Sequence, residues 1–510
     1  MEFSSWALLI MASLAALAFL SKLLPFNFKL HQTKFPPGPK PWPIIGSLNL
    51  IGSHPPQSLH KLAQKYGPIM QLKFGSFIVV VASSSEMAKQ FLKTHDHVFA
   101  SRPSSAAAKY IAYLNITWSP AGPHWRHGRK IFLSELFNSK RLESYQYIRV
   151  EEMRTFVSHL CTLSGKPIML KEHLFHLNLN IISRIVLGNK YVSGSKHENS
   201  IVTLEKFHDM LNELFFLNGV FNIGDWIQWL DFLDLQGYVK RMKALQKKFD
   251  QFLDHVFDEH KAKKEGEKEY FVPKDMVDLL LQMADDPNVD ANLTYDSMKA
   301  FTQELIAGGT DTSTTVMEWA MSELLKQPHL IEKATEELDR VIGRDRWVEE
   351  KDIPQLPYID AIIKETMRMH PVAGLLAPHL ALEDCDVVGY KIRKGTRVFI
   401  NTWSIGRDPS LWDAPEEFYP DRFLGKAIDV KGQNFELLPF GSGRRMCPGY
   451  NFGLKVISST LANMLHGFDW KLQDNMKRED LSMDEVYGFA TSRKFPLIAM
   501  MEPRLPLHFY

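Results

Sequence analysis

The chain has 510 residues, of which 45% are hydrophobic and 23% charged, the composition of a globular protein with a large core. Its 60 basic and 59 acidic residues leave a net charge of +1, which argues against an acidic tail and against a nucleic-acid partner. Three cysteines are too few for a disulfide framework and indicate a reducing compartment. The open question is whether Cys161, Cys385 or Cys447 takes part in chemistry.

An apolar stretch near the N-terminus runs from Trp6 to Leu24 and can cross the ~30 Å hydrocarbon core of a bilayer as a helix. Lysines lie at its end and after it, which favours an uncleaved anchor with the rest of the chain in the cytosol. We therefore expect residues 1–24 to be a single-pass anchor in contact with membrane lipid. A cleaved signal peptide and a buried core helix are the alternatives. Residues 25–43, which are rich in proline, should form an extended linker.

Residues 44–510 contain no second proline-rich linker and no obvious repeat, which favours one large domain over the three that length alone allows. Two β-rich runs, 69–74 and 77–81, flank a Gly-Ser pair and predict a hairpin, and 387–400 is expected to hold further strands. The intervening chain is mostly helical in pattern, so we expect a mainly α (α-rich α+β) fold with small β-sheets. The clearest helices are expected at residues 85–94, 240–264, 298–326 and 330–342.

The third cysteine lies in a loop with the sequence FGSGRRMCPG, residues 440–449. Its glycines leave backbone N–H groups free around the sulfur, and Arg445 adds positive charge two residues before it. The apolar helix expected after Gly449 would direct its N-terminus at the sulfur and favour negative charge there. The pattern therefore predicts that Cys447 is a thiolate that acts as a metal ligand or a nucleophile. The other two cysteines lack such a context and are expected to be structural.

This loop resembles the haem-binding loop of the cytochrome P450 family, F-x-x-G-x-R-x-C-x-G, at every fixed position. The resemblance implies haem b as the cofactor, with Cys447 as the axial thiolate ligand of its iron. It also implies that Arg445 pairs with a haem propionate and that Phe440 packs near the thiolate. Thiolate ligation pushes electron density to the iron and favours cleavage of the O–O bond.

A second motif, Glu365-Thr-Met-Arg368, places an acid and an arginine three residues apart on one helix face. The spacing is weak evidence alone, because many helices contain it by chance. It matches the E-x-x-R motif of the family, in which Arg422, further along the chain, would complete a buried triad. The resemblance implies a structural role for this triad on the thiolate side of the haem.

A third motif puts Gly308 and Gly309 inside an expected helix, followed by Thr310, Asp311 and Thr312. A glycine costs ~1 kcal/mol in a helix interior, so we expect either close approach of a flat ligand or local opening of the helical hydrogen bonds. An acid and a hydroxyl beside a metal can deliver protons. The match to the family pattern [AG]-G-x-[DE]-T-[ST] is complete. The resemblance implies that Asp311 and Thr312 are catalytic and relay protons during dioxygen activation.

A fourth motif pairs Trp125 with Arg129 on one face of a helix, where an indole N–H and a guanidinium can both donate to a carboxylate. Without context such a pair is more often a surface feature. It matches the W-x-x-x-R motif of the family, whose members bind a haem propionate. His379 lies near the position where many relatives carry an arginine that faces the other propionate, and the resemblance leaves this contact open.

The resemblance also locates the substrate pocket and the electron donor. Apolar pocket residues favour a lipophilic substrate, although each is equally compatible with a core position. The donor would be NADPH–cytochrome P450 reductase, attracted by a basic patch on the thiolate side, with scattered solvated charge as the alternative. The patch candidates are Arg126, Lys130, Lys140, Arg141, Arg444 and Lys455. The pocket candidates are Tyr110, Tyr113, Phe215, Phe216, Leu217, Phe221, Val372, Ala373, Leu375, Leu376 and Phe489.

These motifs in their order along the chain identify it as a member of the cytochrome P450 family, similar to plant microsomal enzymes related to flavonoid hydroxylases. The resemblance implies a haem-thiolate monooxygenase that uses O2 and NADPH-derived electrons to oxidise a flavonoid, phenylpropanoid or terpenoid. It implies the endoplasmic reticulum membrane, with the catalytic domain, residues 44–510, in the cytosol. The alternatives are a reductase-independent haem-thiolate isomerase or dehydratase, and a haem-binding protein without catalysis.

Overall fold

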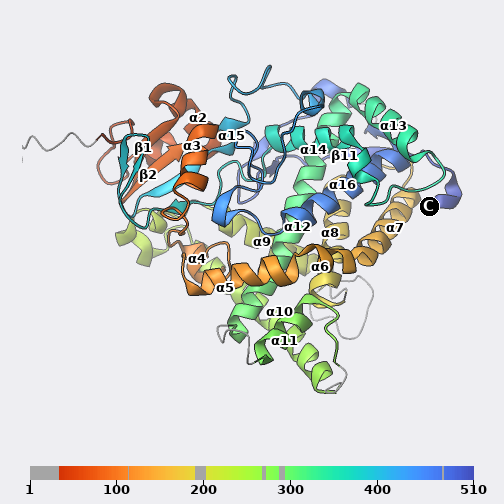
Figure 1. Cartoon of the computed structure of the whole chain (residues 1–510), viewed down its shortest axis with the longest axis horizontal. Coiled ribbons are helices and arrows are strands. Elements are labelled where there is room, and N and C mark those ends of the chain that lie inside the picture. Colours follow the sequence, from red (N-terminus) through yellow and green to blue (C-terminus); the bar gives the residue numbers. More distant parts are fainter. Residues whose placement is uncertain (1–33, 113, 190–202, 267–270, 287–292, 474–475) are drawn as a thin grey trace, which may run out of the picture.

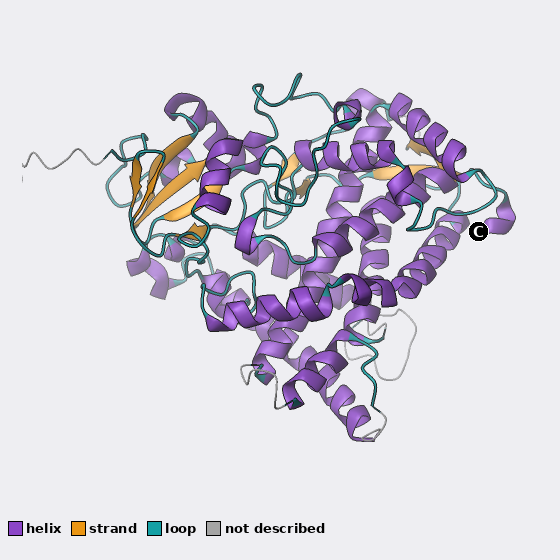
Figure 2. Ribbon diagram, viewed as in Figure 1, coloured by secondary structure: helices purple, strands orange, loops and turns teal. Residues whose placement is uncertain are grey.

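The structure, a computed structural model, is mainly helical, with strands gathered chiefly at one end of the molecule (Figures 1 and 2). The expected mainly α fold with small β-sheets is confirmed. The expected anchor at residues 1–24 lies outside the described residues, and within these no helix is long and apolar enough to span a bilayer. The described residues are 34–112, 114–189, 203–266, 271–286, 293–473 and 476–510.

Helices fill the larger part of the molecule, on the right of Figure 2. The helices expected at residues 240–264, 298–326 and 330–342 are present, and each begins before its predicted start. The helices are α2 (Pro55–Tyr66), α3 (Ser85–Lys89), α4 (Ala106–Tyr110), α5 (Pro123–Ile131), α6 (Ser139–Ser144), α7 (Gln146–Thr162), α8 (Leu170–Leu187), α9 (Leu204–Gly219), α10 (Tyr238–Gly266), α11 (Met276–Asp285), α12 (Tyr295–Lys326), α13 (Pro328–Ile342), α14 (Pro357–Met369), α15 (Thr402–Ile405) and α16 (Tyr450–Gly467).

The strands form four small sheets, with orders β1-β2-β7-β4, β10-β9, β3-β11-β8 and β5-β6 among the described residues. The predicted hairpin is the antiparallel pair β1–β2, closed by Gly75 at a positive φ of 54°. Strand β7 adds to β2 in parallel, which joins late and early segments of the chain. The strands are β1 (Ile69–Phe74), β2 (Phe77–Ala82), β3 (Ile168–Met169), β4 (His379–Leu380), β5 (Cys385–Val387), β6 (Tyr390–Ile392), β7 (Arg397–Ile400), β8 (Phe468–Leu472), β9 (Glu485–Val486), β10 (Ser492–Arg493) and β11 (Ile498–Pro503).

Helix α12 is the central element of the fold and is buried over most of its length (Figure 1). Apolar residues occur on every side of it, which is the pattern of a helix inside a large core. It packs along α8 and against α14 and α16, so helices from both halves of the chain surround it. The polar residues of α12 are therefore held in apolar surroundings.

The helix expected at residues 85–94 changes form along its length. Its first part is α3, and a π-helical turn, Gln90–Thr94, completes it. The backbone oxygen of Leu92 in this turn meets the position that a Cβ on Gly443 would occupy. Gly443 has a φ of 67°, so both its conformation and this close approach require glycine. The wide turn thus lies directly against the loop that carries Cys447.

Candidate active site

One cavity of about 810 Å³ brings together motifs that are far apart in the sequence. Its wall is formed by α5, α12, the loop before α16 and the turn between β9 and β10. Six of the seven site residues that the sequence predicts lie on this wall, whereas Asp311 does not. The six are Trp125, Arg129, Thr312, Phe440, Arg445 and Cys447.

The cysteine loop is closed by hydrogen bonds of its own backbone. The N–H of Cys447 donates to the carbonyl oxygen of Phe440 at 2.9 Å, and the N–H of Met446 donates to Gly443 at 3.2 Å. Helix α16 begins three residues after the cysteine, as expected. Burial raises the pKa of the Cys447 thiol, while the N–H of Gly449 opposes the shift. The loop therefore presents a single sulfur to the cavity within a fixed turn.

Arg445 and Trp125 stack against each other at the edge of the cavity. The guanidinium carbon of Arg445 lies 4.1 Å from the centre of the indole ring. Its nitrogens donate to the carbonyl oxygens of Ala100, Ile116 and Ser119 at 2.5, 2.9 and 2.7 Å. Burial and two neighbouring arginines lower the pKa of Arg445 to about 8. Arg445 is thus held by neutral carbonyl oxygens. Its buried positive charge is unfavourable, and an anion in the cavity would stabilise it.

Arg102 is a second buried cation at this site, and the sequence reasoning missed it. Its Nη1 donates to the carbonyl oxygens of Ala377 and Pro378 at 2.6 and 3.0 Å, and its Nε donates to Thr117 at 3.0 Å. Burial lowers the pKa of Arg102 to about 9. No periodicity or motif in the sequence marks it, because its place in the site depends on the tertiary contact with the segment before β4.

Glu304 supplies the balancing acid and was also missed. Its carboxylate accepts the backbone N–H groups of Ile116 and Thr117 at 2.8 and 2.9 Å, together with the hydroxyl of Thr117. Burial raises the pKa of Glu304, and these donors and Arg445 oppose the rise. The only signal in the sequence was an acid four residues before Gly308, on the helix that carries the third motif.

His379 lies on the cavity wall as a neutral side chain. Burial and the charges of Arg102 and Arg445 lower its pKa to about 3. Its Nδ1 faces the carbonyl oxygen of Phe99 at 2.8 Å, so this nitrogen carries the proton and donates it. Arg102, which is bound to the two residues that precede His379, places a cation beside this histidine.

Gly308 and Gly309 of α12 have different surroundings. Gly308 lines the cavity, and a Cβ there would meet nothing within 4 Å. A Cβ on Gly309 would lie 2.7 Å from Cγ1 of Ile182, so this glycine allows close packing of α12 on α8. The helix continues through both residues, and the Thr312 hydroxyl donates to the carbonyl oxygen of Gly308 at 2.8 Å. The expected close approach is therefore found at Gly309, but it is made by helix α8 and not by a flat ligand.

Asp311 is buried next to α8 and does not line the cavity. Its Oδ1 lies 4.0 Å from Nζ of Lys171 on α8 and has no hydrogen-bond partner. Burial raises its pKa, whereas Lys171 and His208 oppose the rise. Asp311 and Thr312 are therefore adjacent in sequence but face different surroundings, the first toward the side of the protein that carries Lys171 and the second toward the cavity.

The expected buried triad is present behind the cysteine loop. Both oxygens of Glu365 accept from Arg368, at 2.6 and 2.8 Å, and one also accepts from Nε of Arg422 at 3.0 Å. The N–H of Tyr419 adds a fourth hydrogen bond at 2.7 Å. The side chain of Glu365 is fully buried, so the network is closed to solvent and ties α14 to the segment around Arg422.

Most of the pocket candidates line the cavity, but Tyr110 and Phe215 do not, and Tyr113 lies outside the described residues. Of the six patch candidates, Arg141 and Lys455 are half-buried. The exposed members, all on α5, on α6 or beside Cys447, are Arg126, Lys130, Lys140 and Arg444. The cavity candidates confirmed on the wall are Phe216, Leu217, Phe221, Val372, Ala373, Leu375, Leu376 and Phe489.

Residues 36–497 match the family Cytochrome P450. The chain belongs to the cytochrome P450 family. It is 45% identical to a trimethyltridecatetraene synthase of Zea mays, over 93% of this chain and 89% of that protein. It is 44% identical to a dimethylnonatriene synthase of Zea mays, over 94% and 92%. A flavonoid 3′-monooxygenase of Petunia hybrida is 41% identical, over 95% of each chain.

Solved P450 structures share the fold. A zebra fish cytochrome P450 with progesterone superposes with a TM-score of 0.75 at 26% identity, over 88% of this chain and 100% of that one. A second zebra fish structure, with abiraterone, gives a TM-score of 0.73 at 25% identity, over 89% and 100%. The protein is thus a cytochrome P450 monooxygenase whose cofactor is haem iron.

The residues around the cavity fit haem. A cysteine sulfur faces the cavity from one loop, which is the donor that a thiolate-bound haem requires. Four arginines, 102, 129, 397 and 445, and two acids, Asp225 and Glu304, line the same cavity. This group carries an excess of two positive charges, which equals the charge of two haem propionates. The P450 resemblance of the sequence and the charge of the cavity therefore agree.

Proposed function

We propose that the protein is a membrane-anchored haem-thiolate monooxygenase that oxidises a lipophilic plant specialised metabolite. The observation that carries the proposal is the convergence of Cys447, Thr312 and the arginine group on one cavity of about 810 Å³. Haem bound through a thiolate supplies dioxygen activation and insertion of one oxygen atom into a substrate. The protein supplies the ligand, the proton path and the orientation of the substrate.

In this proposal Cys447 is the axial ligand, and the arginine group holds the propionates. Burial lowers the pKa values of Arg445, Arg102 and Arg129, which means that their positive charges are unfavourable in the protein alone. An anion beside them would stabilise these charges. Trp125 stacks on Arg445 and fixes its plane. The propionates would add charge-assisted hydrogen bonds to this group, which are roughly twice as strong as neutral ones.

Thr312 and Asp311 would provide two successive steps of the proton path, one at the cavity and one outside it. The Thr312 hydroxyl faces the cavity and donates to the carbonyl oxygen of Gly308, so it is held in place when a reacting oxygen is absent. Asp311, whose Oδ1 lies 4.0 Å from Lys171 without a hydrogen bond, would collect a proton outside the cavity. A rotation of the Asp311 side chain would carry the proton toward the hydroxyl. Both groups would thus control delivery without contacting the substrate carbon.

The substrate is proposed to be a terpenoid. The two relatives at 45% and 44% identity are synthases whose names describe branched polyenes, and the wall of the cavity is mostly apolar. A flavonoid is the second candidate, supported by the relative at 41% identity and by the aromatic rings of Phe221 and Phe489 on the wall. More of the cavity wall is apolar than polar, so orientation would rest chiefly on shape.

Exposed apolar side chains support the proposed location on the endoplasmic reticulum membrane. Trp42 and Ile44 are 63% and 65% exposed, and Trp229 and Phe232 are 62% and 82% exposed. Apolar residues next to these positions, Ile45 and Leu48 on one side and Trp226, Ile227 and Leu230 on the other, pack in one cluster. This cluster joins the end of the linker to the segment before α10. Such a group of exposed apolar residues, next to the segment that follows the proposed anchor, fits contact with lipid.

Electron supply is proposed to come from NADPH–cytochrome P450 reductase. Arg126, Lys130, Lys140 and Arg444 are exposed, and Arg444 belongs to the cysteine loop itself. Basic side chains at this place would steer an acidic flavoprotein toward the sulfur side. An enzyme that rearranges or dehydrates a peroxide needs no such partner, so dependence on the reductase separates the two classes.

The test is turnover in yeast microsomes that contain a plant reductase. The panel includes acyclic terpenoid alcohols and flavanones, each incubated with and without NADPH. We expect an oxygenated or oxidatively cleaved product from one class only, and only with both NADPH and reductase. Turnover of a fatty-acid hydroperoxide without NADPH would instead identify an isomerase or dehydratase, and the absence of any turnover by haem-loaded protein would support a binding protein.

A further inference from the structure

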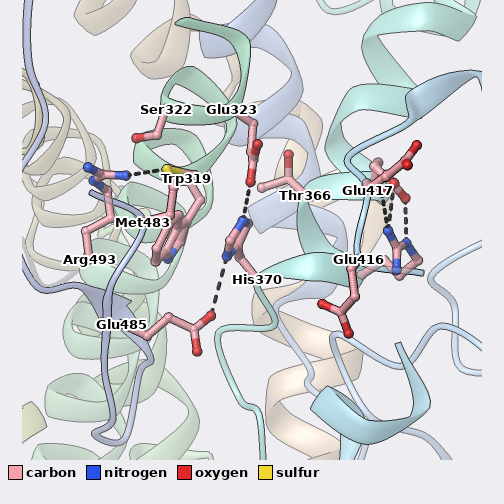
Figure 3. Close-up of polar contacts among 12 residues, drawn as sticks. Trp319, Ser322, Glu323, Thr366, His370, Glu416, Glu417, Met483, Glu485 and Arg493 are labelled. Atoms are coloured by element: carbon pink, nitrogen blue, oxygen red, sulfur yellow. Dashed lines mark hydrogen bonds and ion pairs between the residues drawn. The ribbon is translucent and has the colours of Figure 1, made fainter. Parts of the chain in front are cut away.

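A buried histidine outside the site holds the strand that leads to the cavity wall. His370 follows α14 directly and is 5% exposed. Its Nε2 lies 2.7 Å from Oε1 of Glu323 on α12, and its Nδ1 lies 3.4 Å from Oε1 of Glu485 on β9. Figure 3 shows the ring between the two carboxylates, one on each side. Both ring nitrogens therefore face a carboxylate oxygen, and the ring joins α12 to β9.

The ring is also fixed in its plane. It stacks on Trp319, with the ring centres 3.9 Å apart and an angle of 2° between the planes. Trp319 lies one turn before Glu323 on α12, so this helix holds the His370 ring through both a stacked indole and an acid (Figure 3). The guanidinium of Arg493, on β10, lies 5.2 Å from the indole centre. The stack adds a packing contact to the two contacts with the acids.

Glu485 connects this cluster to a turn on the cavity wall. It pairs with Arg493 across the β9–β10 ladder, and its backbone oxygen lies 2.6 Å from Nε2 of His54. Its pKa is lowered: burial acts to raise it, but the hydrogen bond and charge of His370, and the charge of Arg407, outweigh burial. The turn between β9 and β10 begins at the second residue after Glu485, so a shift of this strand moves the turn directly.

The turn itself contributes Tyr487, Gly488 and Phe489 to the wall. The ring of Phe489 lies 6.1 Å from those of Trp118 and Phe215. Its backbone nitrogen also meets the position that a Cβ on Gly219 would occupy, so α9 and the turn are in close contact. Any movement of the turn therefore changes the shape of the cavity near α9.

We propose that the side chain of His370, held between Glu323 and Glu485, is a positioning element that sets the place of Tyr487–Phe489 and thereby the selectivity of the cavity. The inference rests on the proposed function, because it takes the cavity as the substrate site. His370 and its two acids contact neither haem nor substrate. Their effect reaches the cavity through β9 and the turn, while the centre that carries Cys447 is left intact.

The experiment compares Glu485→Gln and His370→Gln with the wild-type holoenzyme. Glu485→Gln keeps the size of the side chain and the Trp319 stack but removes the charge that faces the ring. The matched control is Asp484→Asn, the residue just before β9, whose ion pair with Lys494 is exposed. Two azoles serve as probes: clotrimazole, which is large enough to touch the wall, and imidazole, which is not. Haem content is measured first for each variant.

We expect Glu485→Gln to weaken clotrimazole binding by about tenfold, equivalent to ~1.4 kcal/mol, with imidazole binding changed by less than about twofold. Amide exchange of residues 484–493 should accelerate, and the control should match the wild type in both measurements. Equal clotrimazole affinity, or unchanged exchange in the turn, would overturn the inference. If His370→Gln fails to retain haem, the Glu485 variant alone decides. Wild-type protein that binds neither azole would contradict the proposed function instead, and the exchange measurement would still test the contact.

Discussion

The carboxylate of Glu304, in the middle of α12, accepts the backbone N–H of Thr117 at 2.9 Å. The carbonyl oxygen of Thr117 accepts in turn from Arg102, and that of Ile116 accepts from Arg445. One short loop is thus held by an acid on one side and by two arginines on the other. The positions of the two cations at the cavity depend on this loop, and the loop depends on Glu304.

The first prediction concerns Glu304→Gln. An amide has one acceptor oxygen, so its NH2 group would face one of the two loop N–H groups and leave that buried donor unpaired, at a cost of ~1–3 kcal/mol. We expect haem to be incorporated but released about tenfold faster, measured by transfer to excess apomyoglobin. The exposed substitution Glu336→Gln, on α13, serves as the control. Equal release rates for Glu304→Gln and wild type would show that the loop is held in another way.

The second prediction concerns the triad behind the cysteine loop. Glu365→Ala removes the partner of two arginines that are 1% and 7% exposed, and an uncompensated buried charge costs ~3–5 kcal/mol. We expect the variant to be expressed without haem, as measured by its Soret absorbance per protein. Glu417→Ala is the matched control, because only the backbone oxygen of Glu417 contacts these arginines. Normal haem content in Glu365→Ala would refute the structural role.

The third prediction concerns the proton path. Thr312→Ala removes the hydroxyl on the cavity wall, so protons reach the reacting oxygen without a fixed donor, and peroxide escapes in place of product. Placed proton-transfer groups contribute ~10²–10⁴-fold, so we expect product formed per NADPH to fall by at least about tenfold. Thr312→Ser retains the hydroxyl and should restore most of the coupling. Unchanged coupling in the alanine variant would exclude a relay through Thr312.

The fourth prediction concerns acid stability. Burial, together with the charges of His159 and His176, lowers the pKa of His173 on α8 to about 4, below its ordinary value of 6.5. The folded chain therefore binds fewer protons here than the unfolded chain, and this residue withdraws stability as the pH falls from about 6.5 to about 4. The free energy of unfolding in urea should fall less between pH 7 and pH 5 for His173→Gln than for wild type. An equal fall in both proteins would contradict this assignment.

The sequence predicts those parts of the site that depend on local contacts and misses those that depend on tertiary contacts. Motifs whose members are neighbours in the chain, such as Trp125 with Arg129 or the loop before α16, are readable because local geometry brings them together. Arg102 and Glu304 escaped notice because their partners are backbone groups of remote loops, which no local pattern marks. Tertiary contacts of this kind form only when the whole core closes.

Asp311 shows that a recognised motif does not fix the surroundings of each of its residues. Its motif was recognised, but the motif does not say which way each side chain points. Successive residues on an α-helix are separated by ~100°, so the pattern alone does not say whether Asp311 lines the cavity together with Thr312. The packing of α12 on α8 places the acid near Lys171.

The central claim, that Cys447 binds haem iron as a thiolate, is tested most directly by the difference spectrum of the reduced protein with carbon monoxide. We predict the red-shifted Soret band of thiolate-bound haem in the wild type and its loss in Cys447→His, while Cys161→Ser and Cys385→Ser retain it. A histidine-type band in active wild-type enzyme, or an unchanged thiolate band in Cys447→His, would contradict the assignment.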